Sequence, residues 1–223
     1  MIRAGLRGWR RGSDELNWRN GELEHVVWRA VILSLDYVYD PCLFKEWEDR
    51  GFESPKLCLK ERGLIRENRT WEEGQPPFCI TVSCSGAKSI QTPLMLEHLL
   101  TCLLTNALKA SRIQDERGLK PDYFKPIDIQ YDSTNSSLVI SNELGGDYPG
   151  LTPVLCDVLN TSRTIEEFET RIQDLLRGPV QDWPGIGLVE AYCVAKQCFG
   201  GLVLDAMSSR VSIRLVGSKK EKR

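Results

Sequence analysis

Apolar residues recur every three or four positions between residues 13 and 39, which predicts a helix with one buried face. Asp40-Pro41 ends this helix, because proline cannot continue it and disfavours helical dihedrals in the residue before it. The charged stretch from Leu43 to Glu73 predicts one or two short helices. The segment EEGQPP (Glu72 to Pro77) then interrupts the pattern, and we interpret it as a boundary.

Beyond that boundary, strand-like and helix-like patterns are well separated. β-rich runs predict strands over residues 78–84, 126–132, 136–142, 202–207 and 210–216. Helical spacing predicts helices over residues 92–113, 164–177 and 188–199, the first of them with Thr92 as its cap and Pro93 in its first turn. The Gly- and Pro-rich residues 145–153 predict an irregular loop. Turn residues between 132 and 136 predict a hairpin, and the last two strands predict another.

This order of elements predicts an α/β fold, specifically a two-layer α/β sandwich. The same order of elements predicts a mixed sheet, and its two hairpins make most of the neighbouring strands antiparallel. We expect a helical N-terminal segment over residues 1–77, an α/β domain over 78–217 and a basic tail over 218–223. The basic residues at both ends of the chain are typical of solvated tails.

Composition is ordinary for a soluble globular protein, with 41% hydrophobic residues and a formal net charge of -2. This charge gives no reason to expect nucleic acid or a membrane surface as a partner. The basic N-terminus is not followed by an apolar run, so it does not read as a signal peptide, and we expect a cytoplasmic protein. Five of the six tryptophans precede residue 78, which fits either a protein-partner surface or a small core.

Eight cysteines raise the question of a metal site or disulfides. No C-x-x-C pair occurs among them, and the chain has two histidines, His25 and His98. Structural zinc sites use closely spaced ligand pairs, so this pattern favours buried free thiols that act as small hydrophobic residues.

Three places in the sequence could hold a ligand. Asn106 and Lys109 share one side of the leucine-rich helix 92–113. They could contact a ligand, or they could be an ordinary pair on the exposed surface of the helix. Asn142 ends a strand just before the glycine pair 145–146. It could bind a ligand, or it could simply stand where the strand leads into a loop. The run Gly185-Ile186-Gly187-Leu188 opens a helix, and a helix start offers backbone N–H groups to phosphate.

Taken together, these places resemble the motifs of the GHKL superfamily, the ATP-binding domains of histidine kinases, gyrase-type topoisomerases and MutL proteins. The resemblance covers residues 78–216 and implies a Bergerat fold that binds ATP or ADP with Mg²⁺. LEHLLTCLLTNALKAS is similar to the N-box, which implies that Asn106 coordinates the metal ion and Lys109 contacts phosphate. ISNELGG is similar to the first glycine box, with Asn142 at the adenine and Gly146 in the turn.

PGIGL is similar to the second glycine box, which implies that Gly185, Ile186, Gly187 and Leu188 line the phosphates and that residues 147–184 form a lid. Cys102 stands where hydrolysing members carry a water-activating glutamate, and Leu144 and Trp183 replace glycines. We therefore expect no catalytic base and no ATP hydrolysis, while histidine phosphorylation stays open.

His25 lies on the first helix, either as a phosphoacceptor or as an ordinary helix residue. The hypothesis is a nucleotide-binding, histidine-kinase-like protein that acts in signal transduction through a protein partner on its N-terminal segment. The alternative is a non-catalytic interaction module that has kept the fold and lost nucleotide hydrolysis. A homodimer is compatible with both.

Overall fold

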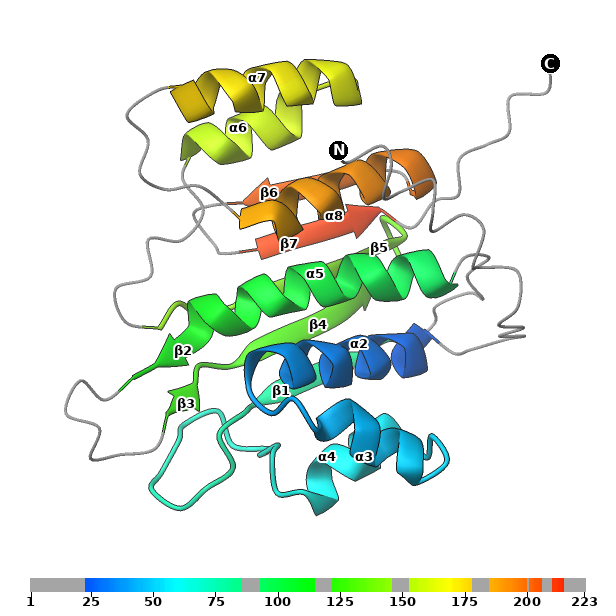
Figure 1. The fold of residues 1–223 in the computed structure, drawn as a ribbon, viewed down its shortest axis with the longest axis vertical. Helices are drawn as coiled ribbons and strands as arrows, with labels where there is room; N and C mark the ends of the chain where they lie inside the picture. The colour runs from blue at the N-terminus through cyan, green and yellow to red at the C-terminus, as the bar shows by residue number, and fades with distance from the viewer. Residues whose placement is uncertain are drawn as a thin grey trace.

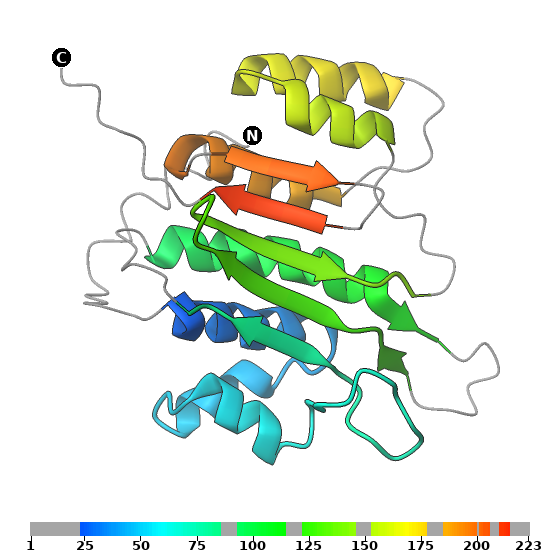
Figure 2. The ribbon, with the colours of Figure 1, turned by 180° about the vertical axis from the view of Figure 1, so that it is seen from behind.

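The computed structural model describes residues 23–85, 93–114, 122–145, 153–177, 185–199, 201–205 and 210–214. Within them a five-stranded sheet is covered on one face by three long helices that lie side by side (Figures 1 and 2). These helices are α2 (Leu23–Val38), α5 (Pro93–Ser111) and α8 (Gly185–Cys198). The predicted α/β sandwich is confirmed.

The strands follow the order β1-β4-β5-β7-β6 across the sheet. Their bounds are β1 (Ile80–Ser83), β4 (Ile127–Asp132), β5 (Ser137–Asn142), β6 (Gly201–Asp205) and β7 (Arg210–Arg214). β1 is parallel to β4, since α5 carries the chain back between them, and the other neighbours are antiparallel. Both predicted hairpins, β4–β5 and β6–β7, form, so the sheet is mixed and mostly antiparallel.

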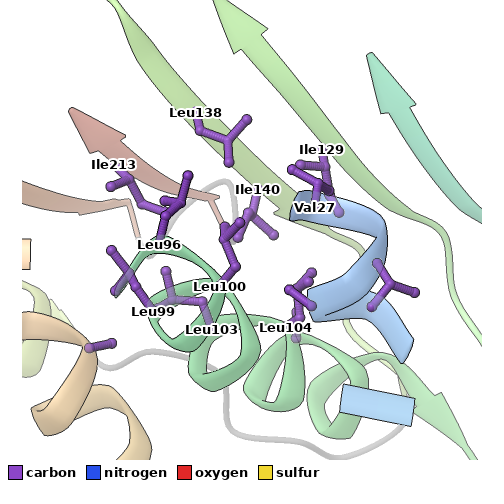
Figure 3. Packing of buried hydrophobic residues seen from close by; sticks show 14 of the residues in the cluster. Val27, Leu96, Leu99, Leu100, Leu103, Leu104, Ile129, Leu138, Ile140 and Ile213 are labelled. Carbon is purple, nitrogen blue, oxygen red and sulfur yellow. The ribbon is translucent and has the colours of Figure 1, made fainter. Parts of the chain in front are cut away.

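The core lies between the sheet and the helical layer (Figure 3). Leu96, Leu100 and Leu104 of α5 are fully buried, as the leucine spacing of this helix predicts. They pack on Leu138 and Ile140, which are two residues apart in β5 and therefore point to the same face of the sheet. This alternation fixes which residues of β5 face the helices.

The N-terminal helix α2 belongs to the same helical layer. It runs parallel to α5: Arg29 Nε lies 2.6 Å from Glu97 Oε2, and the Ser34 hydroxyl donates to the Thr101 carbonyl at 3.2 Å. The short helices α3 (Leu43–Asp49) and α4 (Pro55–Glu61) follow it, as predicted for this stretch. Residues 13–22 of the predicted first helix lie outside the described residues.

A helix that the sequence did not predict begins at the last residue of the expected loop 145–153, and residues 146–152 of that loop lie outside the described residues. α6 (Pro153–Thr161) begins at a proline, which is favourable in the first turn because its missing N–H has no helical partner there. α6 and α7 (Ile165–Arg177) pack on the β6 edge of the sheet and on α8. The Tyr192 hydroxyl of α8 donates to the Ser162 carbonyl at 2.8 Å. Two-residue strands, β2 (Arg112–Ile113) and β3 (Tyr123–Phe124), form a second small sheet.

Candidate functional site

The C-terminal end of α5, the end of β5 and the start of α8 lie at the same end of the molecule (Figures 1 and 2). α8 runs antiparallel to α5, because it is followed by the edge strand β6 that returns along the sheet. A direct contact joins two of the places: the Gly145 N–H, just after β5, donates to the Ala110 carbonyl of α5 at 2.8 Å. The fold thus brings together three segments that the sequence separates.

Asn142 faces the helical layer. It follows Leu138 and Ile140 at the two-residue spacing of one sheet face, and both of those residues pack under α5 (Figure 3). Its Nδ2 atom is buried and has no hydrogen-bond partner among the residues that the structure describes. A buried amide donor without an acceptor costs roughly 1–3 kcal/mol. A ligand acceptor placed between the sheet end and the helices would remove that cost.

Asn106 is half-buried on α5. It follows Leu99 by two turns and Leu103 by one, so it shares their side of the helix. It also follows Cys102 by one turn, and the thiol of Cys102 lies on the α8 side. Asn106 therefore lies on the face of α5 between the sheet and α8, in the part of α5 nearest to the start of α8.

Lys109 is placed differently. Its side chain is exposed, and its Nζ atom lies 5.1 Å from the ring centroid of Tyr37 on α2, which flanks α5 on the side opposite α8. A cation over an aromatic face is a favourable contact in its own right. In this structure the Lys109 ammonium group therefore lies on the α2 side of α5, whereas Asn106 lies on the α8 side.

The run from Gly185 to Leu188 forms the first turn of α8 rather than a turn before it, so the helix begins three residues earlier than predicted. The first four N–H groups of a helix have no partner within the helix, and these four residues supply them. The Leu188 side chain is buried in the core, so only its backbone can reach a ligand. Gly146 and Trp183 lie outside the described residues.

Gly145 is a residue of this site that sequence reasoning missed. A Cβ added there would lie 2.6 Å from the Ser111 carbonyl oxygen and closer still to that of Arg112, far inside normal contact. A glycine is therefore needed where the chain after β5 crosses the end of α5. The glycine pair 145–146 was the available signal, and the first of the two makes this contact.

Two groups near this site, Cys102 and Glu97, are poorly suited to act as a base. Burial raises the pKa of Cys102 to about 12, and the charge of Glu190 adds to the effect, so the thiol is protonated at neutral pH. Burial also raises the pKa of Glu97, against the opposing effect of Arg29. Glu97 pairs with Arg29 on the α2 side, away from α8.

His25 lies at the far end of the helical layer. Arg29 is level with Glu97, His25 precedes Arg29 by four residues, and Asn106 follows Glu97 by nine. At about 1.5 Å rise per residue, His25 and Asn106 are roughly 20 Å apart along the helix axes. The two residues do not share a site within one chain.

No protein-family profile matches the sequence, and no curated protein matches it. Among solved structures, the histidine kinase AdeS of Acinetobacter baumannii is similar at 14% sequence identity, over 96% of this chain and 95% of that chain, with a TM-score of 0.35. A TM-score this low does not establish a shared fold. Within the described part of the chain, no helix has the length and apolar character to cross a bilayer.

Proposed function

We propose that this chain binds ATP or ADP with Mg²⁺ at the end of the helical layer, between α5, the end of β5 and the start of α8. The observation that supports it best is the buried Asn142 amide, which faces that space with a donor unpaired among the described residues. An apolar side chain would fill this position at lower cost, so the carboxamide is better explained by a ligand than by packing.

Each residue type fits one part of a nucleotide. A carboxamide can donate and accept at once, and this matches the adjacent amino group and ring nitrogen of adenine, so Asn142 would hold the base. The N–H groups of Gly185, Ile186, Gly187 and Leu188 stand at the positive end of the α8 dipole and would face phosphate. The Asn106 carbonyl oxygen is a hard donor that suits Mg²⁺. Lys109 would reach phosphate only by leaving Tyr37, and Gly146 would complete the turn after β5.

The proposal includes binding without hydrolysis. Cys102, one turn before Asn106, holds its proton at neutral pH, and Glu97 is engaged by Arg29. A general base must be able to accept a proton and must lie within hydrogen-bond reach of the proton it removes. Cys102 does not meet the first condition, and Glu97, on the α2 side, does not meet the second. The proposed role is therefore that of a signalling or regulatory component that senses nucleotide and acts through a protein partner.

The partner surface belongs, in this proposal, to the N-terminal segment. Trp28 and Trp47 are buried and Trp71 stacks on Tyr123, so these tryptophans serve the fold rather than an interface. The exposed apolar side chains there are different residues. They are Tyr37, Tyr39, Phe52 and Leu57. These exposed side chains also favour the second candidate, an interaction module of the same fold that no longer binds nucleotide.

Thermal denaturation with and without Mg·ATP or Mg·ADP separates the two candidates. For the nucleotide-binding protein, ligand at about 100 times its dissociation constant adds about 2.7 kcal/mol and raises the melting temperature by several degrees. Asn106→Ala and Asn142→Ala should remove most of that rise. Asn135→Ala, in the exposed β4–β5 turn, is the matched control and should keep it. If millimolar nucleotide does not raise the melting temperature, the nucleotide-binding proposal fails and the interaction module is the remaining candidate.

A further inference from the structure

Three side chains of different chemistry converge between α5 and α8. His98 and Cys102 lie one turn apart on α5, with His98 Nε2 3.8 Å from Cys102 Sγ. Glu190 reaches over from α8, and its Oε1 lies 3.3 Å from the same His98 nitrogen. The three donor atoms all lie within 4.8 Å of one another. In the sequence the signal for this cluster is the four-residue spacing of His98 and Cys102 rather than a pair of cysteines.

These distances can be compared with those that a metal ion imposes. Zinc binds imidazole at about 2.05 Å, thiolate at about 2.3 Å and carboxylate at about 2.1 Å in a tetrahedron. A tetrahedron with those bonds separates nitrogen from oxygen by ~3.4 Å and nitrogen from sulfur by ~3.6 Å. The observed 3.3 Å and 3.8 Å are close to both values. Small side-chain rotations would bring the remaining sulfur–oxygen separation into range.

The donor set also selects the class of metal. Thiolate and imidazole ligands suit zinc and similar transition metals, whereas Mg²⁺ takes oxygen ligands. When the metal binds, Cys102 gives its proton to solvent and becomes a thiolate. The divalent ion then balances the charges of that thiolate and of Glu190. With three protein ligands, the fourth position is left for water.

The cluster is accessible to an ion from solvent. The side chains of His98 and Glu190 are 19% and 40% exposed, so these two donors connect the more deeply buried Cys102 to the surface of the helical layer. Its ligands come from two helices that are far apart in the sequence, and a bound ion would join them.

We propose that His98, Cys102 and Glu190 form a Zn²⁺ site that clamps α8 to α5. Because Asn106 follows Cys102 by one turn, the clamp would hold the start of α8 beside the end of α5. This site uses none of the residues assigned to the nucleotide, so each proposal can fail without the other.

The test is metal binding to the full chain without nucleotide. After equilibration with Zn²⁺ and dialysis, elemental analysis should find about one zinc per chain. Substitution with Co²⁺ should give the near-ultraviolet thiolate-to-metal charge-transfer band and the strong visible bands of a tetrahedral site. Cys102→Ser should abolish the charge-transfer band and weaken zinc binding more than about 100-fold, beyond the 10–100-fold typical of losing an outer partner.

Two controls make the result specific. Cys42→Ser removes an exposed cysteine just before α3 and should leave zinc binding and the Co²⁺ spectrum unchanged. Asn106→Ala should bind zinc as the wild type does. Glu190→Gln keeps the shape of the third ligand and should weaken binding, so it tests the site if Cys102→Ser does not fold, as judged by near-ultraviolet circular dichroism. A wild type that takes up less than a tenth of an equivalent of zinc, or a folded Cys102→Ser protein that binds like Cys42→Ser, overturns the proposal.

Discussion

At the scale of single residues, the hydrogen-bond partners of a buried polar group indicate whether that group serves the fold or a ligand. Tyr192 is fully buried, and its hydroxyl donates to the Ser162 carbonyl, so its polar atom is satisfied by the fold. The Asn142 donor has no such partner among the described residues, although it too is buried. A satisfied group stabilises the native state, whereas an unsatisfied group costs stability that a ligand can restore.

Replacing Asn142 with leucine tests this reasoning from the opposite direction. Asn142→Leu removes an unpaired donor and adds apolar contacts, so the free energy of unfolding without ligand should stay the same or rise by up to about 1 kcal/mol. The stabilisation by Mg·ATP should disappear. Urea denaturation with and without nucleotide measures both quantities. A clear loss of stability in the ligand-free protein would show that the Asn142 amide serves the fold.

Tyr192 gives a pH-dependent prediction. Burial raises its pKa to about 12, while an unfolded tyrosine titrates near 10. The folded state therefore holds this proton more tightly, so the contribution to stability is complete below about pH 10 and is lost as pH rises through the folded pKa. Between pH 10 and 12 the free energy of unfolding of the wild type should fall more steeply than that of Tyr192→Phe. Equal slopes would contradict the burial of the hydroxyl.

At the scale of elements, α6 closes the edge of the sheet. β6 pairs with β7 on one side, and on the other the Asn160 side chain both donates to the Leu204 carbonyl at 2.7 Å and accepts from its N–H at 2.8 Å. An open strand edge invites pairing with another chain, and a covering helix prevents it. In this way the expected lid region contributes helices that dock on β6 and α8.

Asn160→Ala should loosen the contact between α6 and the edge strand β6. Both Leu204 backbone groups lose their side-chain partner, which should cost about 2 kcal/mol of unfolding free energy. Hydrogen exchange should speed up at the Leu204 amide and along α6. Asn135→Ala, which removes an amide from an exposed turn, should change stability by less than about 0.5 kcal/mol. If the Leu204 amide exchanges at the wild-type rate, α6 does not hold the edge of β6.

Elements with a long, clean periodicity could be predicted from the sequence. α5 and the two hairpins carry a leucine stripe or strand runs with turn residues between them, and the structure confirms all three. α6 was missed because the glycines and prolines before it mask its start, although Pro153 is compatible with a first helical position. β2 and β3 are two residues long, too short for any period to appear.

The candidate site was predictable only in part. Local spacing leaves Asn106, Asn142 and the start of α8 open to ordinary structural roles, and it is their joint resemblance to the GHKL motifs that singles them out. The sequence could not show that Lys109 leans on Tyr37, that Gly145 crosses the end of α5, or that Glu190 meets His98. Each of these depends on which helix lies beside α5, and such neighbours are decided by tertiary packing rather than by local pattern.

At the scale of the whole molecule, the directions of the elements create the site. α5 and β5 end, and α8 begins, at one end of the sandwich, so the strand and helix ends that carry Asn142 and Asn106 and the first-turn N–H groups of α8 share one region (Figure 1). His25 lies at the other end, so phosphoryl transfer from this region to His25 within one chain is not favoured. A nucleotide bound there would contact both α5 and α8, and it would couple them to the N-terminal helix that packs on α5.

Calorimetric titration of the full chain with ATP and with ADP, each with and without Mg²⁺, tests the central claim most directly. We predict one nucleotide per chain, with tighter ATP binding in Mg²⁺ and with that Mg²⁺ dependence lost in Asn106→Ala. Asn135→Ala should titrate like the wild type. The absence of binding heat for either nucleotide at millimolar concentration, at more than one temperature and with Mg²⁺ present, would contradict the claim.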